Sequence, residues 1–184
     1  MDTNAYISRA EFRAWAEQQP RGRFERVDGR VVRMTPERLV HGLLKGAVYR
    51  ALDEAVRAAG IEALAFPDGV TVEVGEDTDY EPDALVNLGS IASLDGMAAP
   101  NPVIVVEVLS PGTRSVDTGE KLAGYFRVPS VQHYLVVSAR RREVVHYRRA
   151  AGAIATTVVT EGAIALDPPG ISVALEAIYR DVGL

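Results

Sequence analysis

The chain has 184 residues, of which 47% are hydrophobic and 24% charged, a composition typical of globular proteins and a length close to that of one domain. It contains no cysteine, which excludes disulfides, thiolate metal ligands and cysteine nucleophiles. The net charge of -5 argues against a general nucleic-acid coat protein, because such proteins present a basic surface.

Nothing in the sequence indicates export or membrane insertion. The N-terminal residues lack a basic segment followed by an apolar one, and no run approaches the roughly 18 apolar residues of a membrane span. No internal repeat, low-complexity tract or long linker divides the chain. We therefore expect a single domain over residues 1–184, and a soluble, cytoplasmic protein with no membrane partner.

The first third of the chain predicts a short helix, a hairpin and a longer helix. Residues 8–11 carry the Ser-x-x-Glu pattern of a capping box, which starts the short helix. The Asp-Gly pair at residues 28–29 lies between two alternating segments and predicts a two-residue hairpin turn. Apolar residues then recur at helical spacing over residues 37–59, and Gly60 ends that helix.

The rest of the chain predicts a mixed sheet flanked by helices. The strand at 103–109, a helix from about Asp117 and the strand at 131–138 form a βαβ crossover, which places both strands in one sheet. A last short helix is expected over residues 174–182. The predicted fold class is α+β, with a central mixed sheet, an N-terminal β-hairpin and C-terminal antiparallel strands. The strand candidates are residues 61–66, 70–74, 83–88, 103–109, 131–138, 142–149, 153–159 and 162–166.

Arginines cluster twice along the chain, and the clusters admit two interpretations. They predict either a local basic surface for nucleic acid or, more ordinarily, solvated strand and turn faces. The first cluster contains Arg21, Arg23, Arg26, Arg30 and Arg33, and the second contains Arg140, Arg141, Arg142, Arg148 and Arg149.

Glu107 interrupts the apolar strand at 103–109. A buried carboxylate is costly unless it is neutralised, paired with a cation or bound to a metal. Asp83 opens the strand candidate at 83–88, so if the two strands are neighbours, both carboxylates can hold one hard cation. Magnesium often takes one or two protein carboxylates, with water and substrate phosphate completing its shell, and such an ion can activate water for phosphodiester cleavage.

Lys121 lies four residues after Asp117 on the predicted helix, and two interpretations of it remain open. The two side chains can form a surface ion pair worth about 0.2–0.5 kcal/mol. Alternatively, the Lys121 ammonium points back at the carboxylates, where it can orient a nucleophilic water or stabilise charge at phosphorus.

Four segments stand out in order along the chain: GRFERVDGRVVRM, EPDALV, VIVVEVLSPGTRSVDTGEK and YFRVPSVQHYLVV. Together with His41 they resemble the Uma-two family of putative restriction endonucleases, a branch of the PD-(D/E)XK phosphodiesterase superfamily. The resemblance spans nearly the whole chain and implies a restriction-endonuclease-like fold. It also implies a nuclease site that acts on DNA with Mg²⁺, or with Mn²⁺ in its place, bound by Asp83 and Glu107. A homodimer is implied as well, because superfamily nucleases often cut one strand with each subunit.

One position departs from the superfamily pattern. The standard motif has a lysine two residues after the second acid, where this chain has Leu109. Members of this branch look as if they take the lysine from the following helix, so the resemblance implies Lys121 as the catalytic lysine. It also implies Glu25 as a further acid and His41 as a hydrogen-bonding residue of the same cleft. For Glu25, an ordinary charge on a half-exposed strand is an equal alternative, and for His41 the alternative is a structural or solvent-facing residue.

Two hypotheses of different classes follow. The leading one is a Mg²⁺-dependent endodeoxyribonuclease that cleaves by in-line attack of a metal-activated water. The alternative is a catalytically inactive DNA-binding or dimerisation module that keeps the nuclease fold, in line with the acidic charge and the displaced lysine. A small-molecule hydrolase is a weaker third hypothesis, because the sequence supplies neither its nucleophile nor a dedicated pocket.

Overall fold

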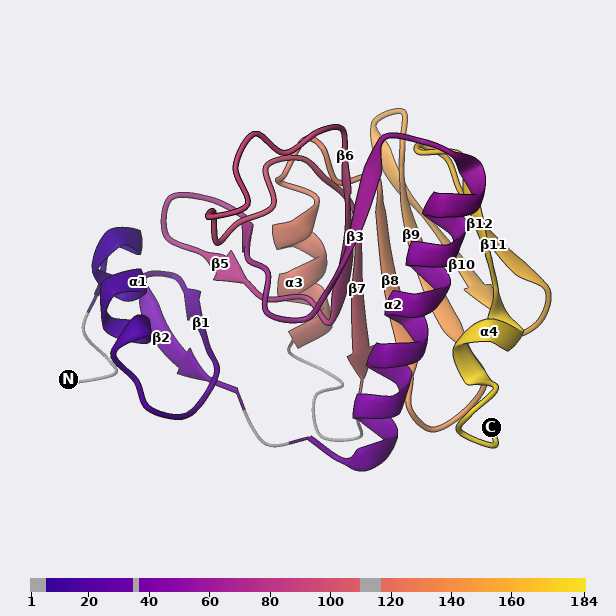
Figure 1. Ribbon diagram of the computed structural model, residues 1–184, viewed down its shortest axis with the longest axis horizontal. Coiled ribbons are helices and arrows are strands. Elements are labelled where there is room, and N and C mark those ends of the chain that lie inside the picture. The colour runs from indigo at the N-terminus through magenta and orange to yellow at the C-terminus, as the bar shows by residue number, and fades with distance from the viewer. Residues whose placement is uncertain (1–5, 35–36, 110–116) are drawn as a thin grey trace.

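A six-stranded sheet forms the centre of the molecule, in the order β10-β9-β8-β7-β6-β3 (Figure 1). The computed structural model describes residues 6–34, 37–109 and 117–184. In this sheet β7 and β8 run parallel and the other neighbouring pairs are antiparallel, so the sheet is mixed. Its strands are β3 (Ala63–Pro67), β6 (Ala84–Leu88), β7 (Pro102–Leu109), β8 (His133–Ser138), β9 (Val144–Ala150) and β10 (Ala153–Val159).

Two smaller sheets accompany the central one. A four-stranded sheet with the order β2-β1-β5-β4 contains the N-terminal hairpin, and β11 pairs with β12 near the C-terminus. In Figure 1 the N-terminal hairpin and α1 lie at one end of the molecule and the C-terminal hairpin at the other. The strands are β1 (Phe24–Val27), β2 (Arg30–Arg33), β4 (Val72–Glu73), β5 (Asp79–Tyr80), β11 (Ala163–Leu166) and β12 (Ile171–Ala174).

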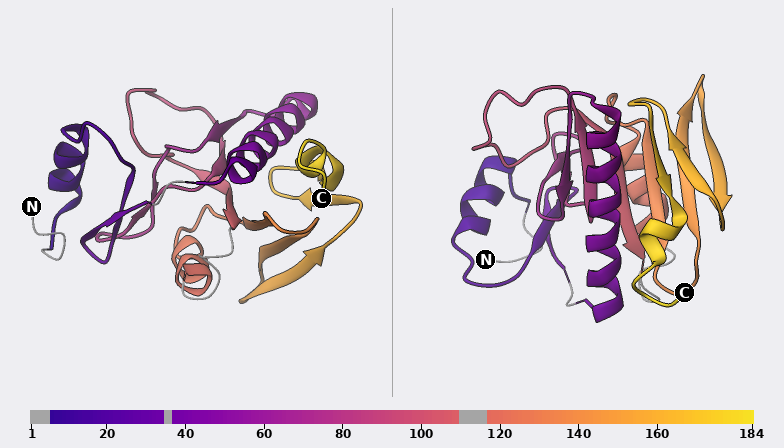
Figure 2. Two further views of the ribbon diagram at one scale, coloured as in Figure 1. Left: turned by 90° about the horizontal axis from the view of Figure 1, so that it is seen from below. Right: turned by 45° about the vertical axis from the view of Figure 1, so that its right-hand side comes forward.

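Helices cover both faces of the central sheet (Figure 2). On one face, α2 and α4 pack with the β11–β12 hairpin over the larger apolar core. On the other face, α3 packs over a second, smaller core. None of the described helices is both long enough and apolar enough to cross a membrane. The helices are α1 (Arg9–Glu17), α2 (Leu39–Ala59), α3 (Asp117–Tyr125) and α4 (Leu175–Tyr179).

Local sequence signals explain several element ends. The capping box of α1 is formed, with the Ser8 side chain accepting from the Glu11 N–H. Asp28 and Gly29 both have positive φ, 49° and 71°, as a two-residue hairpin turn between twisted strands requires. Gly60 adopts the left-handed conformation that commonly ends a helix, with φ 63°. The predicted hairpin and helix ends are therefore confirmed.

The predicted fold class is confirmed, and the differences lie in short elements. The strand expected at residues 70–74 is formed only as Val72–Glu73, and the last helix ends at Tyr179. β5 and β12 are strands that the sequence pattern does not indicate. β5 has only two residues and pairs with β4 on one side and with β1, through Arg26 and Asp79, on the other, so it depends on its partners and not on a local run of strand-forming residues.

Alternation along β7 sends its side chains to two different cores. Ile104, Val106 and Val108 belong to the core under α2, whereas Val105 belongs to the core under α3. Glu107 is two residues after Val105, so period-two alternation places its carboxylate on the α3 side of the sheet. The contacts of Glu107 with α3 confirm this placement.

Candidate active site

The register between β6 and β7 brings the two predicted acids together. Ala84 pairs with Val106, and the Asp83 N–H donates to the Val106 carbonyl at 2.9 Å. Continuing this antiparallel register by one residue places Asp83 opposite Glu107, where side chains of neighbouring strands lie close together. The two residues are 5% and 7% exposed, respectively. The two carboxylates are close enough that Asp83 acts on the pKa of Glu107.

Glu107 is held by two side chains of α3. Its Oε1 accepts from Lys121 Nζ at 3.0 Å and from the Tyr125 hydroxyl at 2.6 Å. Lys121 Nζ also lies 3.0 Å from Oε1 of Glu25, which additionally accepts from the Glu81 N–H at 2.9 Å. Lys121 therefore bridges two buried carboxylates from β1 and β7, as the second interpretation of the sequence predicts. The side chain of Asp117, its alternative partner, lies outside the described residues.

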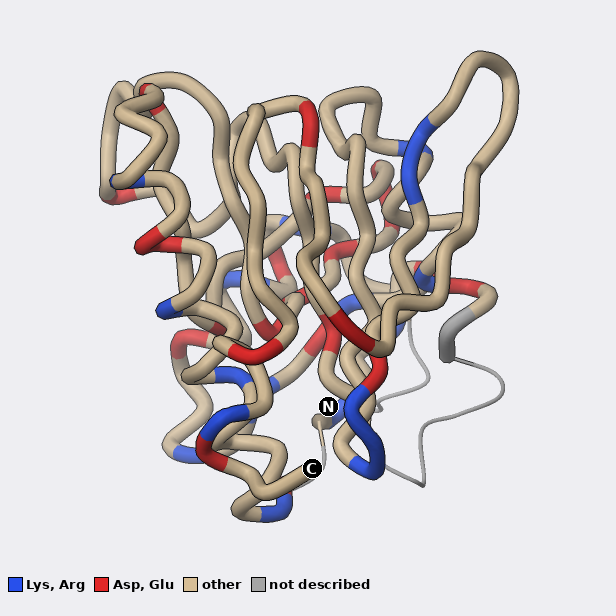
Figure 3. Tube along the Cα trace, turned by 90° about the vertical axis from the view of Figure 1, so that its right-hand side faces the viewer, with Lys and Arg blue, Asp and Glu red and all other residues tan. Residues whose placement is uncertain are grey.

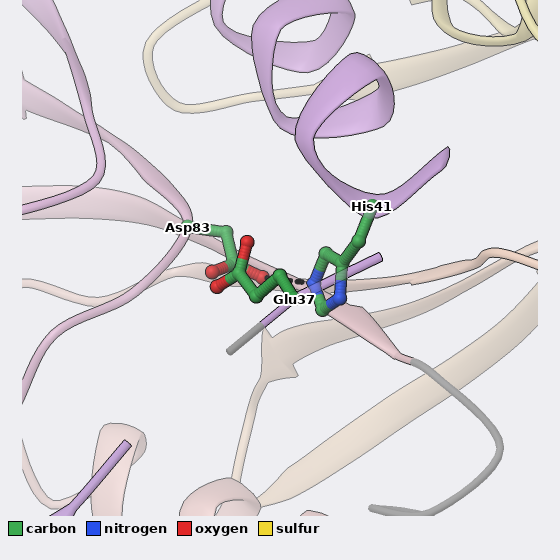
Figure 4. A group of neighbouring side chains, drawn as sticks. All are labelled: Glu37, His41 and Asp83. Atoms are coloured by element: carbon green, nitrogen blue, oxygen red, sulfur yellow. Dashed lines mark hydrogen bonds and ion pairs between the residues drawn. The ribbon is translucent and has the colours of Figure 1, made fainter. Parts of the chain in front are cut away.

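Asp83 is held by α2 and by the backbone of β7. Its Oδ1 lies 2.7 Å from Lys45 Nζ, and its Oδ2 accepts from the Val108 N–H at 2.6 Å. His41 Nε2 lies 3.4 Å from the same Oδ2. Figure 4 shows Asp83 and His41 pointing toward one another, with Glu37 beside them. Both oxygens of Asp83 thus have partners within the protein.

The environment of Glu107 favours its protonated form. Burial raises the pKa of Glu107 to about 7, although the Lys121 ammonium opposes the shift. The negative charges of Asp83 and Glu25 add to the rise. Burial by itself lowers the pKa of Lys121, but Glu107 and Glu25 raise it more, so the net shift is upward. Lys121 is therefore a permanent cation at neutral pH.

Asp83 has the opposite balance. Burial raises the pKa of Asp83. The hydrogen bond with His41, the Lys45 charge and the Val108 N–H together lower this pKa by more than burial raises it, so the net shift is downward. Burial likewise lowers the pKa of Lys45, and Asp83 and Glu37 more than reverse this effect. Asp83 is therefore ionised beside a protonated Lys45, while Glu107 titrates near neutrality.

Negative charge exceeds positive charge across the connected network. Lys45 also contacts Glu37 and Asp68, and Arg23 pairs with both Asp68 and Glu81. When every acid is ionised, the six carboxylates outnumber the three permanent cations by three charges. Three of the six carboxylates, those of Glu25, Asp83 and Glu107, are buried, and such an excess is chemically suited to a divalent cation. The six carboxylates are those of Glu25, Glu37, Asp68, Glu81, Asp83 and Glu107.

Two sets of residues could hold a metal ion: Asp83 with Glu107, or Asp83 with Glu37 and His41. Among the described residues, Glu37, His41 and Asp83 each offer a ligand atom within 4.8 Å of the others. Glu107 is not a member of this group, and within the described residues its hydrogen bonds go to Oε1. Carboxylate oxygens suit Mg²⁺ and Mn²⁺, whereas an imidazole ligand also suits softer transition metals.

Some residues of the site carry no motif signal. Tyr125 is the hydrogen-bond donor to Glu107, but nothing in its local sequence distinguishes it from a packing aromatic. For Glu37 and Lys45, features of the sequence other than a motif could have indicated the site. Glu37 lies four residues before His41 and Lys45 four residues after it, and residues at this spacing lie on the same side of a helix and of the segment that leads into it. The chain also has just two lysines, Lys45 and Lys121, and both are buried in this site.

The arginine clusters do not form one continuous basic surface. Arg26 is fully buried and pairs with Asp79 at 2.7 Å, whereas Arg30 and Arg33 are exposed. In the second cluster Arg149 stacks over Phe126 and donates to backbone carbonyls. Figure 3 shows basic and acidic positions intermixed along the trace. The clusters therefore divide between internal contacts and solvated positions.

His133 and His146 form a separate buried pair. His133 Nδ1 lies 2.9 Å from His146 Nε2, and His133 Nε2 lies 2.9 Å from the Pro168 carbonyl. Burial and the neighbouring His146 together lower the pKa of His133 to about 4. This pair contacts the C-terminal hairpin and takes no part in the acid cluster.

Comparisons with known proteins show the same family and fold. The sequence model of the Uma2 family, described as "Putative restriction endonuclease", matches residues 9–178. The crystal structure of a putative nuclease belonging to DUF820, from Anabaena variabilis, has a TM-score of 0.71 and covers 95% of this chain and 98% of that chain at 18% identity. An uncharacterised protein of Synechocystis is 35% identical over 81 residues, which are 43% of this chain and 43% of that protein. That match spans less than half of the relative's length.

Proposed function

The chain belongs to the Uma2 family of putative restriction endonucleases, and on this premise we propose that it is a Mg²⁺-dependent endonuclease that hydrolyses DNA phosphodiester bonds. One observation carries the proposal. Asp83 and Glu107 lie side by side at one end of the central sheet, and Lys121 Nζ lies 3.0 Å from Glu107. This is the set of two acids and one lysine that the sequence resemblance implies.

Asp83 and Glu107 would hold the ion, with Mn²⁺ able to replace Mg²⁺. The residues fit such an ion because the network has more carboxylates than cations and because carboxylate oxygens are the ligands that Mg²⁺ prefers. When bound, the ion supplies a Lewis acid that polarises the phosphate and lowers the pKa of a water molecule. His41 lies beside Asp83 and would stabilise its position, while Glu37 contacts the Lys45 ammonium that pairs with Asp83.

Lys121 supplies the positive charge that the reaction requires from the protein. Its ammonium lies between Glu25 and Glu107 at 3.0 Å from each, which fixes its direction. In this role it orients the attacking water and stabilises negative charge at phosphorus. Glu25 positions the ammonium, and the Tyr125 hydroxyl holds the Glu107 carboxylate in place.

The displaced lysine has a structural counterpart. Leu109, at the position where the superfamily motif has lysine, packs with the apolar core under α3. Lys121 reaches Glu107 from the helix that follows β7. We therefore propose that the α3 lysine replaces the usual strand lysine in this chain.

Plasmid cleavage tests the proposal. The wild-type protein is expected to cut DNA with Mg²⁺ or Mn²⁺ and not with EDTA, and Asp83→Asn or Glu107→Gln is expected to lower the rate at least about 100-fold, because each substitution removes a proposed ligand. Asp181→Asn and Glu176→Gln are matched controls at exposed ion pairs with Arg50 and Arg142. Cleavage that persists in both site variants contradicts the proposal.

One contact favours the alternative function. Lys45 Nζ lies 2.7 Å from Asp83 Oδ1, so an internal cation already contacts the first acid, as expected of an inactive DNA-binding or dimerisation module. Calorimetric titration with Mg²⁺ separates the two functions. A nuclease site gives binding heat that Asp83→Asn abolishes, whereas an inactive module gives no heat that depends on Asp83.

We also propose a homodimer, since two strands must be cut and each chain supplies one acid cluster. Light scattering coupled to size exclusion is expected to give twice the 19.8 kDa mass of one chain. A monomer at micromolar concentration, with and without DNA, contradicts this arrangement.

A further inference from the structure

A cavity of about 220 Å³ lies between α1, β1 and the loops that precede β4 and β7. Its apolar walls include Phe12, Ala16, Phe24 and Met97, and its polar side includes Arg23 and Glu81. The proposed hydrolysis uses none of these side chains. The combination of a few polar groups with apolar walls is typical of small-molecule sites.

The size of the cavity limits its occupant. A cavity of about 150 Å³ holds benzene, whereas drug-sized ligands need about 300–1,000 Å³. The volume of about 220 Å³ therefore matches a heterocycle of one or two rings and is too small for a peptide or a whole dinucleotide.

The walls are suited to a flat ring. Phe12 and Phe24 both contact Trp15, with ring centroids 6.3 Å and 4.8 Å away. The Trp15 ring therefore supports the two phenylalanine rings of the cavity wall. Met97 is 43% exposed, and a ligand in the cavity would cover part of this polarisable side chain. Aromatic and apolar side chains of this kind stack against bases taken out of a nucleic-acid strand.

The polar side presents a fixed donor and a fixed acceptor. Arg23 Nη2 lies 3.0 Å from Glu81 Oε2, and Arg23 Nη1 is fixed by Asp68. Guanine matches this pair best among the bases. Arg23 Nε and Nη2 both donate to Glu81 Oε2, so the guanine N1–H or N2–H₂ group can donate to Glu81 Oε1, while O6 and N7 accept from the remaining guanidinium N–H groups.

Glu81 links the wall of the cavity to the acid cluster. Glu81 is two residues before Asp83, a distance of about 6.6 Å along an extended backbone. The Glu81 N–H donates to Glu25, which contacts Lys121. A nucleotide whose base occupies the cavity would therefore have its phosphodiester beside the proposed catalytic residues.

We propose that this cavity is a nucleobase pocket with a preference for guanine, in which Arg23 and Glu81 read one base next to the cleavage site. The inference rests on the proposed nuclease function. It adds a substrate feature, since the base must leave its stack, or be unstacked already, to enter the cavity.

Fluorescence titration tests the pocket without any cleavage. Trp15 is the single tryptophan of the chain and contacts two walls of the cavity, so its emission reports occupancy. We expect saturable binding of dGMP in EDTA, roughly tenfold tighter than that of dAMP, dCMP or dTMP, and calorimetry provides a second measurement. Ala16→Phe is expected to weaken dGMP binding at least about tenfold by filling the cavity, whereas Ala14→Phe, on an exposed position of the same helix, leaves it unchanged.

The outcomes separate this inference from the nuclease proposal. Asp83→Asn is expected to bind dGMP like the wild type while losing cleavage, because the titration contains no divalent ion. Glu81→Gln is expected to remove the preference for dGMP while circular dichroism shows an intact fold. No saturable binding of any nucleotide by either measurement, or undiminished binding in Ala16→Phe, overturns the pocket. Equal binding of all four nucleotides by the wild type overturns the assignment of Arg23 and Glu81 as base-reading residues.

Discussion

At the scale of single residues, the two lysines of the chain carry the most information. The other 18 basic residues are arginines, yet Lys45 and Lys121 are both buried against carboxylates of the acid cluster. A lysine ammonium is a compact point charge, whereas a guanidinium is a planar fork. The compact charge fits between Glu25 and Glu107, where one nitrogen contacts both carboxylates.

Replacement of Lys121 tests its role as the shared cation. Lys121→Met is expected to lower the free energy of unfolding at pH 8 by roughly 3–5 kcal/mol, because it leaves Glu25 and Glu107 buried without their cation, and to abolish cleavage. Urea denaturation measures the stability. The double variant Lys121→Met with Glu107→Gln is expected to recover part of the loss. Additive losses in the double variant would contradict a direct pairing.

The pH dependence of stability tests the burial of Glu107. The pKa of Glu107 is about 7 in the folded protein, above the usual 4.5, so the folded state binds this proton more tightly than the unfolded state does. The resulting stabilisation is complete below pH 4.5 and is lost as the pH rises to about 7. We expect it to amount to roughly 3 kcal/mol.

Glu107→Gln is the variant that isolates this effect. Because an amide does not titrate, the variant is expected to lack the decline in unfolding free energy between pH 5 and pH 8 that the wild type shows. Glu176→Gln, at an exposed position, keeps the wild-type decline. Parallel pH profiles for the wild type and Glu107→Gln would show that Glu107 ionises normally.

At the scale of elements, the N-terminal hairpin brings Glu25 to the site. Arg26, the next residue on β1, is fully buried and donates to Asp79 on β5 at 2.7 Å. Arg9 of α1 donates to the other oxygen of Asp79 at 2.7 Å. These ion pairs hold α1, β1 and β5 together. The orientation of the Glu25 side chain on β1 therefore depends on the four-stranded sheet as a whole.

Gly29→Ala tests this dependence. Gly29 has φ 71°, and an added Cβ would meet the Tyr6 ring at 2.2 Å. Gly152 has a similar φ of 72°, and an added Cβ there would meet no atom of the described residues within 4 Å. Gly152→Ala is therefore the matched control. Both variants are expected to lose about 1–2 kcal/mol in urea denaturation from the left-handed backbone. Gly29→Ala is expected to lose more and, unlike the control, to cut DNA more slowly. Equal effects on both properties would argue against the hairpin as a positioning element.

At the scale of the molecule, three parts of the fold meet at one end of the central sheet. Asp83 directly precedes β6, β7 supplies Glu107, α2 supplies Lys45, and α3 supplies Lys121. Because helices cover both faces of the sheet, the acids are removed from water, and their mutual repulsion is compensated mainly by the lysines. If the site binds the proposed ion, the ion would compensate the remaining negative charge and stabilise the whole chain.

Thermal unfolding with Mg²⁺ or Mn²⁺ tests this coupling. At an ion concentration 100 times the dissociation constant, binding adds about 2.7 kcal/mol of stability, which raises the melting temperature by about 5–10 °C for a chain of this size. Asp83→Asn is expected to abolish the rise and Asp181→Asn to keep it. An equal rise in both variants would place the ion elsewhere.

The sequence by itself determined the features that local patterns and motif order encode. The Asp28-Gly29 turn, the helix ending at Gly60 and the parallel crossover after β7 follow from backbone preference and hydrophobic period. The lone carboxylate of Glu107 in an apolar strand signals a site, because burying an unpaired charge is too costly to be incidental. Motif order supplied the candidates Glu25, His41, Asp83 and Lys121, and the family.

The way in which these residues meet depends on tertiary packing. The pairing of β6 with β7 sets Asp83 beside Glu107, and the position of α3 brings Lys121 to both Glu25 and Glu107. The contacts of Lys45 and Tyr125 in the site likewise depend on helices packed against the sheet. The physical reason is distance along the chain: Lys121 and Glu25 are 96 residues apart, and local propensity does not encode interactions between segments so widely separated.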